Sequence, residues 1–309
     1  MIGFMKRIFI TGGTGFFGKS IFDYWSRKPR FLNNVEITVL SRDPEAFCMK
    51  YPDISRQCGL HWVKGDIRTF QVNGKYDYIV HAATTIDLQN TNEMYSSIID
   101  GTNNLLSFAK VCGAKKILYV SSGAVYGPRT SPASENDECL PVTAYGKGKL
   151  QAERMLLDSG LDVKIARCFA FAGRHLPRTI HYAIGNFIQD CLDGQPIVIN
   201  GDGTPLRSYM YADDLVEWLF AILERGKNGR VYNVGSDKAL SIRELAASVR
   251  SILGVKNEIV VKGKPDSAKL PSVYVPVIER AKYELGLELK TSIESSIRRM
   301  AGLSEREQL

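Results

Sequence analysis

KRIFITGGTGFFG, residues 6–18, decides the fold of this chain. Residues 6–10 are typical of a short buried strand, and residues 19–26 are typical of a helix. The glycines therefore occupy the turn that joins a strand to a helix. Such a turn forms a cradle for the pyrophosphate of a dinucleotide, because the N-terminus of the helix attracts negative charge.

Three glycines of this turn have separate expected roles. Gly12 permits the tight turn, Gly15 lets the backbone approach a pyrophosphate, and Gly18 allows close packing of the helix on a strand. Their spacing is Gly-x-x-Gly-x-x-Gly rather than the Gly-x-Gly-x-x-Gly of many dehydrogenases. Glycines are common in turns of every kind. The prediction of a dinucleotide-binding turn therefore rests on the position of these glycines between a strand and a helix.

Apolar runs and helical patterns alternate over the first half of the chain, which predicts an α/β fold with a doubly wound parallel sheet of the Rossmann type. After residue 167 the loops lengthen and prolines recur, which indicates a smaller C-terminal lobe. Two capping boxes, Ser241–Glu244 and Thr291–Glu294, are expected to begin helices in that lobe. We predict a dinucleotide-binding domain at 1–175 and 207–238, and a substrate-binding lobe at 176–206 and 239–309. The apolar runs are 35–40, 76–80, 117–120 and 163–166, and the helical patterns are 93–112 and 144–158.

Composition excludes several classes of protein. The chain has 309 residues and a net charge of +7 without a long Lys/Arg run, which argues against nucleic-acid binding and suits an anionic substrate. Six scattered cysteines without a CxxC pair favour reduced thiols in a cytoplasmic protein and no metal site. The sequence contains no run of about 18 apolar residues, so it does not predict a helix that spans a membrane.

Tyr145 and Lys149 are four residues apart, so they share one face of a predicted helix. A free tyrosine has a pKa of about 10, and a nearby ammonium lowers that pKa. The pair therefore forms a proton donor and acceptor suited to hydride transfer at a carbonyl. Ser122 can supply a second hydrogen bond to the same oxygen. The pair alone is also common on solvated helix faces, so the other motifs decide its meaning.

Six motifs in order resemble the extended short-chain dehydrogenase/reductase family, and specifically its branch of nucleotide-sugar epimerases, dehydratases and reductases. The resemblance covers about residues 6–300 and implies that Ser122, Tyr145 and Lys149 are catalytic. It also implies that Lys149 holds the ribose next to the nicotinamide. The motifs are TGGTGFFG (11–18), VHAA (80–83), VSSGAVYG (120–127), YGKGK (145–149), GDGTPLRSYMYADD (201–214) and YNVGS (232–236).

The end of the second predicted strand favours NADP(H) over NAD. Relatives that use NAD place a carboxylate there to bind the ribose 2′-hydroxyl. This chain has Ser41 and Arg42, which can donate to a 2′-phosphate, although Asp43 would favour NAD if it turned inward. Asp66 matches the family's adenine-contacting Asp, or is a turn residue. The predicted cofactor residues are Gly12, Thr14, Gly15, Phe16, Phe17, Gly18, Ser41, Arg42, Asp66, Ile67, Ala82, Ala83, Tyr145 and Lys149.

The reaction type depends on a departure from the family. Dehydratases of this branch carry Asp and Glu where this chain has Gly123 and Ala124, so dehydration is not expected. The resemblance then implies NADPH-dependent reduction of a keto group, with C4 of a nucleotide-linked 6-deoxyhexose as the expected position. The alternatives are a 4-epimerase with retained NAD and a reductase of non-sugar substrates. A non-catalytic cofactor-binding scaffold is a further alternative, which the intact Ser122, Tyr145 and Lys149 oppose.

The expected partner is a nucleotide-diphosphate sugar. The family's Asn, Tyr and Pro after the sixth strand are replaced by Ala170, Ala172 and Arg174, which leaves the sugar and the nucleotide open. The resemblance also implies a homodimer paired through helices 93–112 and 144–158, with apolar contacts from Leu105, Leu106, Phe108, Ala109 and Cys112. The predicted substrate-binding residues are Ser122, Gly123, Tyr145, Asn186 and Arg207.

Overall fold

The computed structural model describes residues 6–28, 34–57, 59–84, 90–178, 182–266, 268 and 270–303. The chain forms two compact units. The first comprises Met1–Gly127, Glu138–Cys168 and Val216–Tyr232, and the second comprises Pro128–Asp137, Phe169–Leu215 and Asn233–Leu309.

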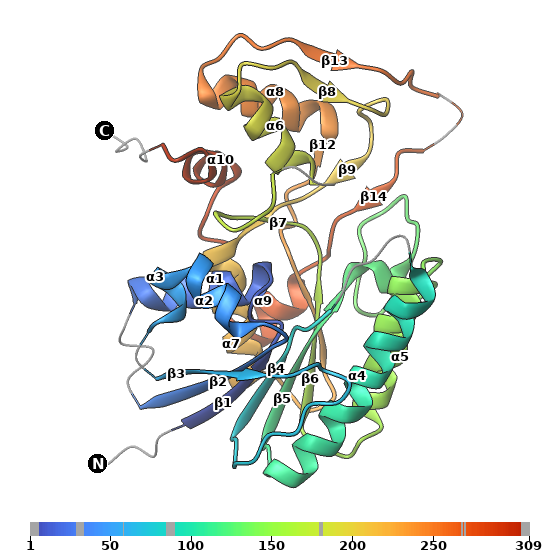
Figure 1. The fold of residues 1–309 in the computed structure, drawn as a ribbon. Coiled ribbons are helices and arrows are strands. Elements are labelled where there is room, and N and C mark those ends of the chain that lie inside the picture. Colours follow the sequence, from blue (N-terminus) through green and yellow to red (C-terminus); the bar gives the residue numbers. More distant parts are fainter. Residues whose placement is uncertain are drawn as a thin grey trace. The chain divides into compact units, whose positions relative to one another are not determined.

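A seven-stranded sheet forms the centre of the first unit, in the order β11-β6-β5-β4-β1-β2-β3 (Figure 1). From β6 to β3 the neighbouring strands run parallel, and Ile10 of β1 lies opposite both Val39 of β2 and Val80 of β4. The predicted doubly wound parallel sheet is therefore confirmed. The strands are β1 (Lys6–Thr11), β2 (Val35–Ser41), β3 (Leu60–Lys64), β4 (Tyr78–His81), β5 (Lys116–Ser122), β6 (Val163–Cys168) and β11 (Val231–Val234).

Helices cover both faces of this sheet. On one face lie α4 and α5, and on the other lie α1 and α7 (Figure 1). Phe9 of β1 packs its ring 4.6 Å from that of Phe108 on α4. Trp25 of α1 packs 4.9 Å from Phe220 of α7, between ring centroids. The helices are α1 (Phe16–Arg27), α2 (Pro44–Lys50), α3 (Pro52–Ser55), α4 (Thr91–Cys112), the 3-10 helix η2 (Gly123–Tyr126), α5 (Ala144–Leu157) and α7 (Ala212–Arg225).

Helix α1 begins at Phe16, earlier than the predicted start at residue 19. Phe16, Phe17 and Gly18 therefore form its first turn rather than the loop before it. Gly15 is the N-cap and has an extended backbone. The prediction was wrong here because glycine has a low helix propensity, whereas Gly18 is needed inside the helix for packing.

The apolar residues predicted to pair two copies of the chain are buried within one copy. Leu105, Phe108, Ala109 and Cys112 belong to the core between α4, α5 and the sheet, and Leu106 packs against it. The four core residues are covered by the chain's own elements and are not available for a dimer interface, whereas Leu106 is only partly buried. The homodimer stays a prediction, which light scattering tests.

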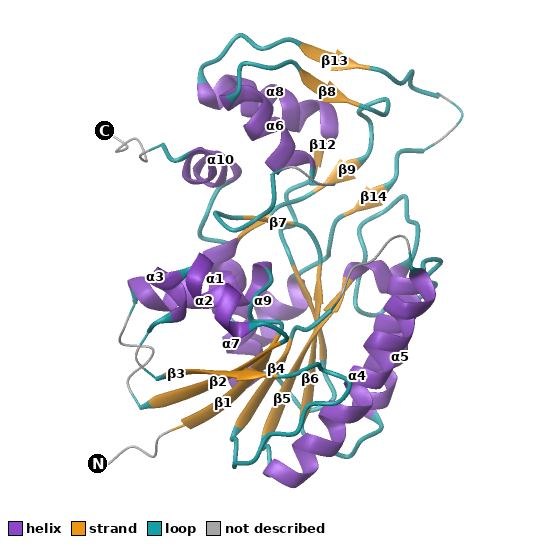
Figure 2. Cartoon of the chain, in the orientation of Figure 1, coloured by secondary structure: helices purple, strands orange, loops and turns teal. Residues whose placement is uncertain are grey.

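The second unit contains several small sheets and four helices in the part that the structure describes. Strand β13 pairs with β8, β7 with β10, and β9 lies between β12 and β14 (Figure 2). The elements are β7 (Phe171–Ala172), α6 (Ala183–Leu192), β8 (Ile197–Ile199), β9 (Leu206–Arg207), β10 (Met210–Tyr211), β12 (Leu240–Ser241), α8 (Ile242–Leu253), β13 (Ile259–Val261), β14 (Val273–Tyr274), α9 (Glu279–Leu285) and α10 (Ile293–Ala301).

One of the two predicted capping boxes is confirmed and the other is wrong. Ser241 and Glu244 form a capping box that begins α8. Helix α10, however, is capped by Ser292, which accepts from the backbone N–H of Ser295. The backbone N–H of Thr291 donates instead to the carboxylate of Asp214 at 3.0 Å, so the helix begins one residue later.

Every helix among the described residues is too short or too polar to span a lipid bilayer. The described cysteines are all free thiols, and Cys58 lies outside the described residues. No group of three or more His, Cys, Asp or Glu side chains in the described part of the chain is arranged to hold a metal ion.

Candidate cofactor and active site

A cavity of about 520 Å³ lies where β1, β2 and β4 end. It occupies the point at which the strand order reverses on either side of β1, where doubly wound sheets bind their ligands. Most of the predicted cofactor residues line it. They are Gly12, Thr14, Gly15, Ser41, Arg42, Asp66, Ile67, Ala82 and Ala83.

The glycine turn has the shape that a dinucleotide requires. Gly12 has a φ of +78°, and a Cβ on it would lie 2.5 Å from the backbone of Ala82, so only glycine fits there. A Cβ on Gly15 would meet nothing of the protein closer than 3.4 Å. Since Gly15 lines the cavity, such a Cβ would narrow the space at the helix N-terminus, where a pyrophosphate binds. The turn therefore fits a dinucleotide.

Gly18 packs against the turn rather than against a strand. A Cβ on it would lie 2.2 Å from Cα of Gly13, and a Cβ on Gly13 would lie 2.2 Å from the side chain of Val39 on β2. The turn is thus pressed between α1 and β2, which the triplet spacing did not reveal. Phe16 and Phe17 are absent from the cavity lining, and their rings contact each other with centroids 5.8 Å apart.

The side chains after β2 divide between the cavity and helix α2. Ser41 and Arg42 line the cavity. The carboxylate of Asp43 instead accepts from the backbone N–H of Ala46 at 3.0 Å and caps α2. The backbone N–H of Asp43 donates to the Ser41 hydroxyl at 3.2 Å. Asp43 is therefore held at the helix and away from the position of a ribose-binding carboxylate.

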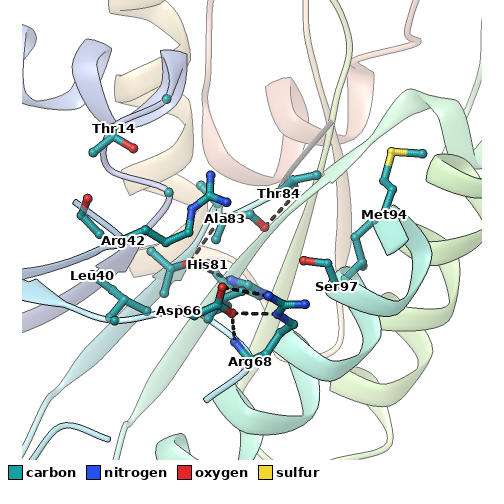
Figure 3. A pocket seen from close by; sticks show the side chains of 18 of the residues that line it. Thr14, Leu40, Arg42, Asp66, Arg68, His81, Ala83, Thr84, Met94 and Ser97 are labelled. Carbon is teal, nitrogen blue, oxygen red and sulfur yellow. Dashed lines mark hydrogen bonds and ion pairs between the residues drawn. The ribbon is translucent and has the colours of Figure 1, made fainter. Parts of the chain in front are cut away.

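Asp66 lies beside Arg68 in the cavity wall (Figure 3), which Glu93 also lines. Sequence reasoning missed both Arg68 and Glu93. Arg68 forms ion pairs with Asp66 at 2.9 Å and with Glu93 on α4 at 2.6 Å. The hydrogen bonds from Arg68 hold the pKa of Asp66 below its ordinary value. The signal that could have found Arg68 is its place two residues after Asp66 in the same turn.

His81 and Thr11 join the ends of β4 and β1 in the cavity wall, and sequence reasoning missed both. The Thr11 hydroxyl lies 2.7 Å from Nδ1 of His81 and accepts from the backbone N–H of Ala83 at 3.2 Å. Burial, together with the nearby charge of Lys149, lowers the pKa of His81 to about 3. His81 is therefore neutral at physiological pH and holds the Ala82–Ala83 loop in place.

Lys149 is tied from helix α5 to strand β5. Its ammonium is buried, donates to the carbonyl oxygen of Val120 at 2.9 Å, and lies 5.9 Å from the ring centroid of Tyr145. Burial lowers the pKa of Lys149 to about 8. The structure thus places Lys149 beside Tyr145. The carbonyl group that Lys149 binds belongs to Val120, two residues before Ser122 on β5.

The first turn of α5 lies directly against the segment that follows Ser122. A Cβ on Gly146 would lie 2.6 Å from the carbonyl oxygen of Ala124, so the two backbones touch. The Ser122 hydroxyl accepts from the backbone N–H of Ala124 at 3.1 Å, which orients it at the end of β5. Gly123 is buried in η2. Ser122 and Tyr145 therefore come from two backbone segments in close contact.

A buried ion pair supports this arrangement. Glu153, one turn after Lys149 on α5, accepts from Nη2 of Arg167 on β6 at 2.7 Å and from the hydroxyl of Ser121. Both charged side chains are almost fully buried. The pair joins α5 to the end of β6 and was not predicted from the sequence.

Asn186 and Arg207 belong to the second unit. Asn186 lies in the first half of α6, whose N-cap is Tyr182. Its side-chain oxygen is buried without a hydrogen-bond partner in the described structure. Arg207, on β9, donates to the carbonyl oxygen of Leu206 at 2.8 Å, and its guanidinium lies 5.9 Å from the ring centroid of Tyr274.

Residues 8–235 match the model of the NAD dependent epimerase/dehydratase family, which is more than half of the chain. The chain belongs to this family. It is therefore an enzyme of the NAD-dependent epimerase/dehydratase family that uses a nicotinamide dinucleotide.

Similar members of the family carry different activities. The chain is 28% identical to UDP-glucuronic acid decarboxylase 6 of Arabidopsis thaliana, over 94% of this chain and 86% of that protein. It is also 28% identical to a trifunctional UDP-glucose 4,6-dehydratase, UDP-4-keto-6-deoxy-D-glucose 3,5-epimerase and UDP-4-keto-L-rhamnose reductase of the same plant. That match covers 83% of this chain and 41% of that enzyme.

The fold is also that of solved epimerase structures. The UDP-glucuronic acid 4-epimerase from Bacillus cereus, in complex with UDP-glucuronic acid and NAD, superposes with a TM-score of 0.82. The two chains are 20% identical, and the superposition covers 96% of this chain and 98% of the epimerase.

Proposed function

We propose that this protein reduces the keto group, at C4, of a nucleotide-linked 6-deoxyhexose with NADPH. The observation that carries the proposal is the arrangement after β2. Ser41 and Arg42 line the cavity, whereas the carboxylate of Asp43 caps α2. The wall therefore offers hydrogen-bond donors where a carboxylate would select NAD.

Arg42 is available for a 2′-phosphate. Its side chain makes no hydrogen bond or ion pair with the rest of the described chain, and its charge helps to lower the pKa of the nearby Asp66 carboxyl. Hydrogen bonds to charged groups contribute about 1.5–3 kcal/mol each. One such bond to the phosphate gives about a ten- to hundredfold preference for NADPH over NADH, at about 1.4 kcal/mol per factor of ten.

A preference for NADPH favours net reduction. An epimerase removes and returns the same hydride and regenerates its cofactor, whereas a reductase consumes NADPH from a pool. Dehydration needs an acid and a base beside Ser122, but η2 has Gly123 and Ala124 at those positions. Neither side chain can transfer a proton.

The chain's own residues account for the proton and for the charge on oxygen. NADPH, when bound, supplies the hydride. Ser122 and Tyr145 donate hydrogen bonds to the keto oxygen, which stabilise the negative charge that develops there. Tyr145 then gives its proton to the oxygen. Lys149 stays mostly protonated at neutral pH, because its pKa is about 8, and its charge favours the tyrosinate that remains.

The substrate class is proposed from the relatives. The proteins named above act on UDP-linked sugars according to their names, and one of them is named for reduction of a UDP-4-keto sugar. Arg207 is the proposed diphosphate-binding residue, since its forked guanidinium suits a bidentate phosphate contact. Asn186 is proposed to contribute its buried, unpartnered amide oxygen to the same substrate.

Epimerisation at C4 with retained NAD is the second candidate. It is favoured by the family description, which names epimerases, and by Ser122, Tyr145 and Lys149, which such a reaction would also use. Incubation with NADPH and a nucleotide-linked 4-keto-6-deoxyhexose separates the two. A ketoreductase oxidises one NADPH for each product formed. Interconversion of two saturated nucleotide sugars without loss of NADPH would instead establish the epimerase.

A further inference from the structure

All three nitrogens of the Arg68 guanidinium donate hydrogen bonds to carboxylates. Nε and Nη2 donate to the two carboxylate oxygens of Asp66 at 2.9 and 3.1 Å. Nη1 donates to Glu93 of α4 at 2.6 Å. The backbone N–H of Arg68 also donates to Asp66, at 2.9 Å. Two carboxylates from two different elements therefore fix the plane of this side chain.

The Arg68 side chain is partly open to a ligand in the cavity. Arg68 lines the cavity, and 39% of its side chain is exposed. It lies in the wall beside Asp66, which matches the family's adenine-contacting Asp (Figure 3). A guanidinium plane stacks on aromatic rings, whereas the edge donors that would grip a phosphate are committed to carboxylates.

The charges around Arg68 differ from those around Arg42. A 2′-phosphate beside Arg68 would also meet the carboxylates of Asp66 and Glu93, which repel it. The adenine base carries no charge and avoids this cost. Arg42 is near enough to Asp66 for its charge to lower the pKa of that carboxyl, but no carboxylate of the described chain binds its guanidinium directly, so the phosphate is better placed there.

We propose that Arg68 is a cofactor-positioning residue on whose guanidinium plane the adenine of NAD(P) stacks, while the 2′-phosphate is bound at Arg42 and not at Arg68. The inference rests on the dinucleotide cofactor of the family. It goes beyond the proposed ketoreduction, because a stacked adenine is needed whether the enzyme reduces or epimerises.

Calorimetric titration of the purified protein with NADPH, NADH and ADP tests this. Replacement of Arg68 by Lys keeps the charge and removes the plane, so we expect binding of all three to weaken about five- to tenfold, because an ammonium cannot stack on the adenine as a planar guanidinium does. Arg68→Tyr restores a plane without charge, and should bind all three better than Arg68→Lys does. Arg42→Ala is the matched control and should weaken NADPH alone.

Two results would overturn the inference. If Arg68→Lys binds as the parent does and Arg68→Tyr does not, the charge matters and the plane does not. If the loss in Arg68→Lys falls on NADPH and spares NADH and ADP, Arg68 is a phosphate ligand. Circular dichroism confirms that each variant is folded before titration. No sugar is present, so a failed ketoreductase assay leaves these outcomes unchanged.

Discussion

The ammonium of Lys149 donates to the carbonyl oxygen of Val120 at 2.9 Å, which fixes helix α5 to strand β5 at the point where the strand approaches Ser122. The bond orients a buried cation beside Tyr145 and leaves its remaining N–H groups for a ligand. The position of Tyr145 and Lys149 therefore depends on the packing of α5 on β5. Substitutions in α5 or β5 should change cofactor affinity and the free energy of unfolding.

Replacement of Tyr145 by Phe should preserve cofactor binding and reduce kcat by at least about a hundredfold, which is the usual scale for loss of a general acid or base. The phenylalanine ring fills the same space and lacks only the hydroxyl. Single-turnover assays with NADPH, together with titration of the cofactor, test both parts. Turnover close to that of the parent would remove Tyr145 from its role as proton donor.

Replacement of Arg42 by Ala should weaken NADPH binding about ten- to hundredfold and change NADH binding little, because one charge-assisted bond to the 2′-phosphate is lost. Titration of both cofactors against both proteins measures this. Asp43→Asn is a useful control, because the structure assigns that side chain to α2 and not to the cofactor. Equal losses for both cofactors would place Arg42 outside the phosphate site.

The stability of the cofactor-free protein should depend on pH through Lys149. Burial lowers its pKa from 10.5 to about 8, so between these values the unfolded chain binds more protons than the folded protein. The free energy of unfolding therefore gains a contribution that rises with pH across this window. Below about pH 8 both states are protonated and the contribution is constant.

Urea unfolding of the parent and of Lys149→Met, at intervals from below this window to above it, isolates the effect. The free energy of unfolding of the parent should rise relative to that of Lys149→Met as the pH increases from about 8 to 10.5. A constant difference would show that Lys149 titrates in the folded protein as it does in the unfolded chain.

Replacement of Glu153 by Ala should lower the free energy of unfolding by about 3–5 kcal/mol, because it leaves the buried charge of Arg167 without its partner. Glu36→Ala is the matched control. It removes the exposed ion pair between Glu36 and Arg7, which should cost less than about 1 kcal/mol. Chemical denaturation compares the two variants, and equal effects would contradict a structural role for the buried pair.

The sequence by itself determined the sheet, the glycine turn and the helix that carries Tyr145 and Lys149. These depend on short-range patterns, such as apolar runs, helical spacing and glycine between a strand and a helix, whose physical causes act within a few residues. The capping box of Ser241 and Glu244 was predictable for the same reason. The helix start at Phe16 was not, because packing of Gly18 on Gly13 outweighs its poor helix propensity.

Only the tertiary structure decided which charges meet. Arg68 and Glu93 are 25 residues apart in the chain. Glu153 lies on helix α5 and its partner Arg167 on strand β6. No local sequence pattern therefore indicates either ion pair. The face of α4 that was expected to pair two copies packs on the chain's own sheet, since an amphipathic helix pattern shows that a face is buried and not what buries it. Burial likewise sets the pKa of Lys149, because desolvation depends on every element packed around the ammonium and not on its neighbours in the sequence.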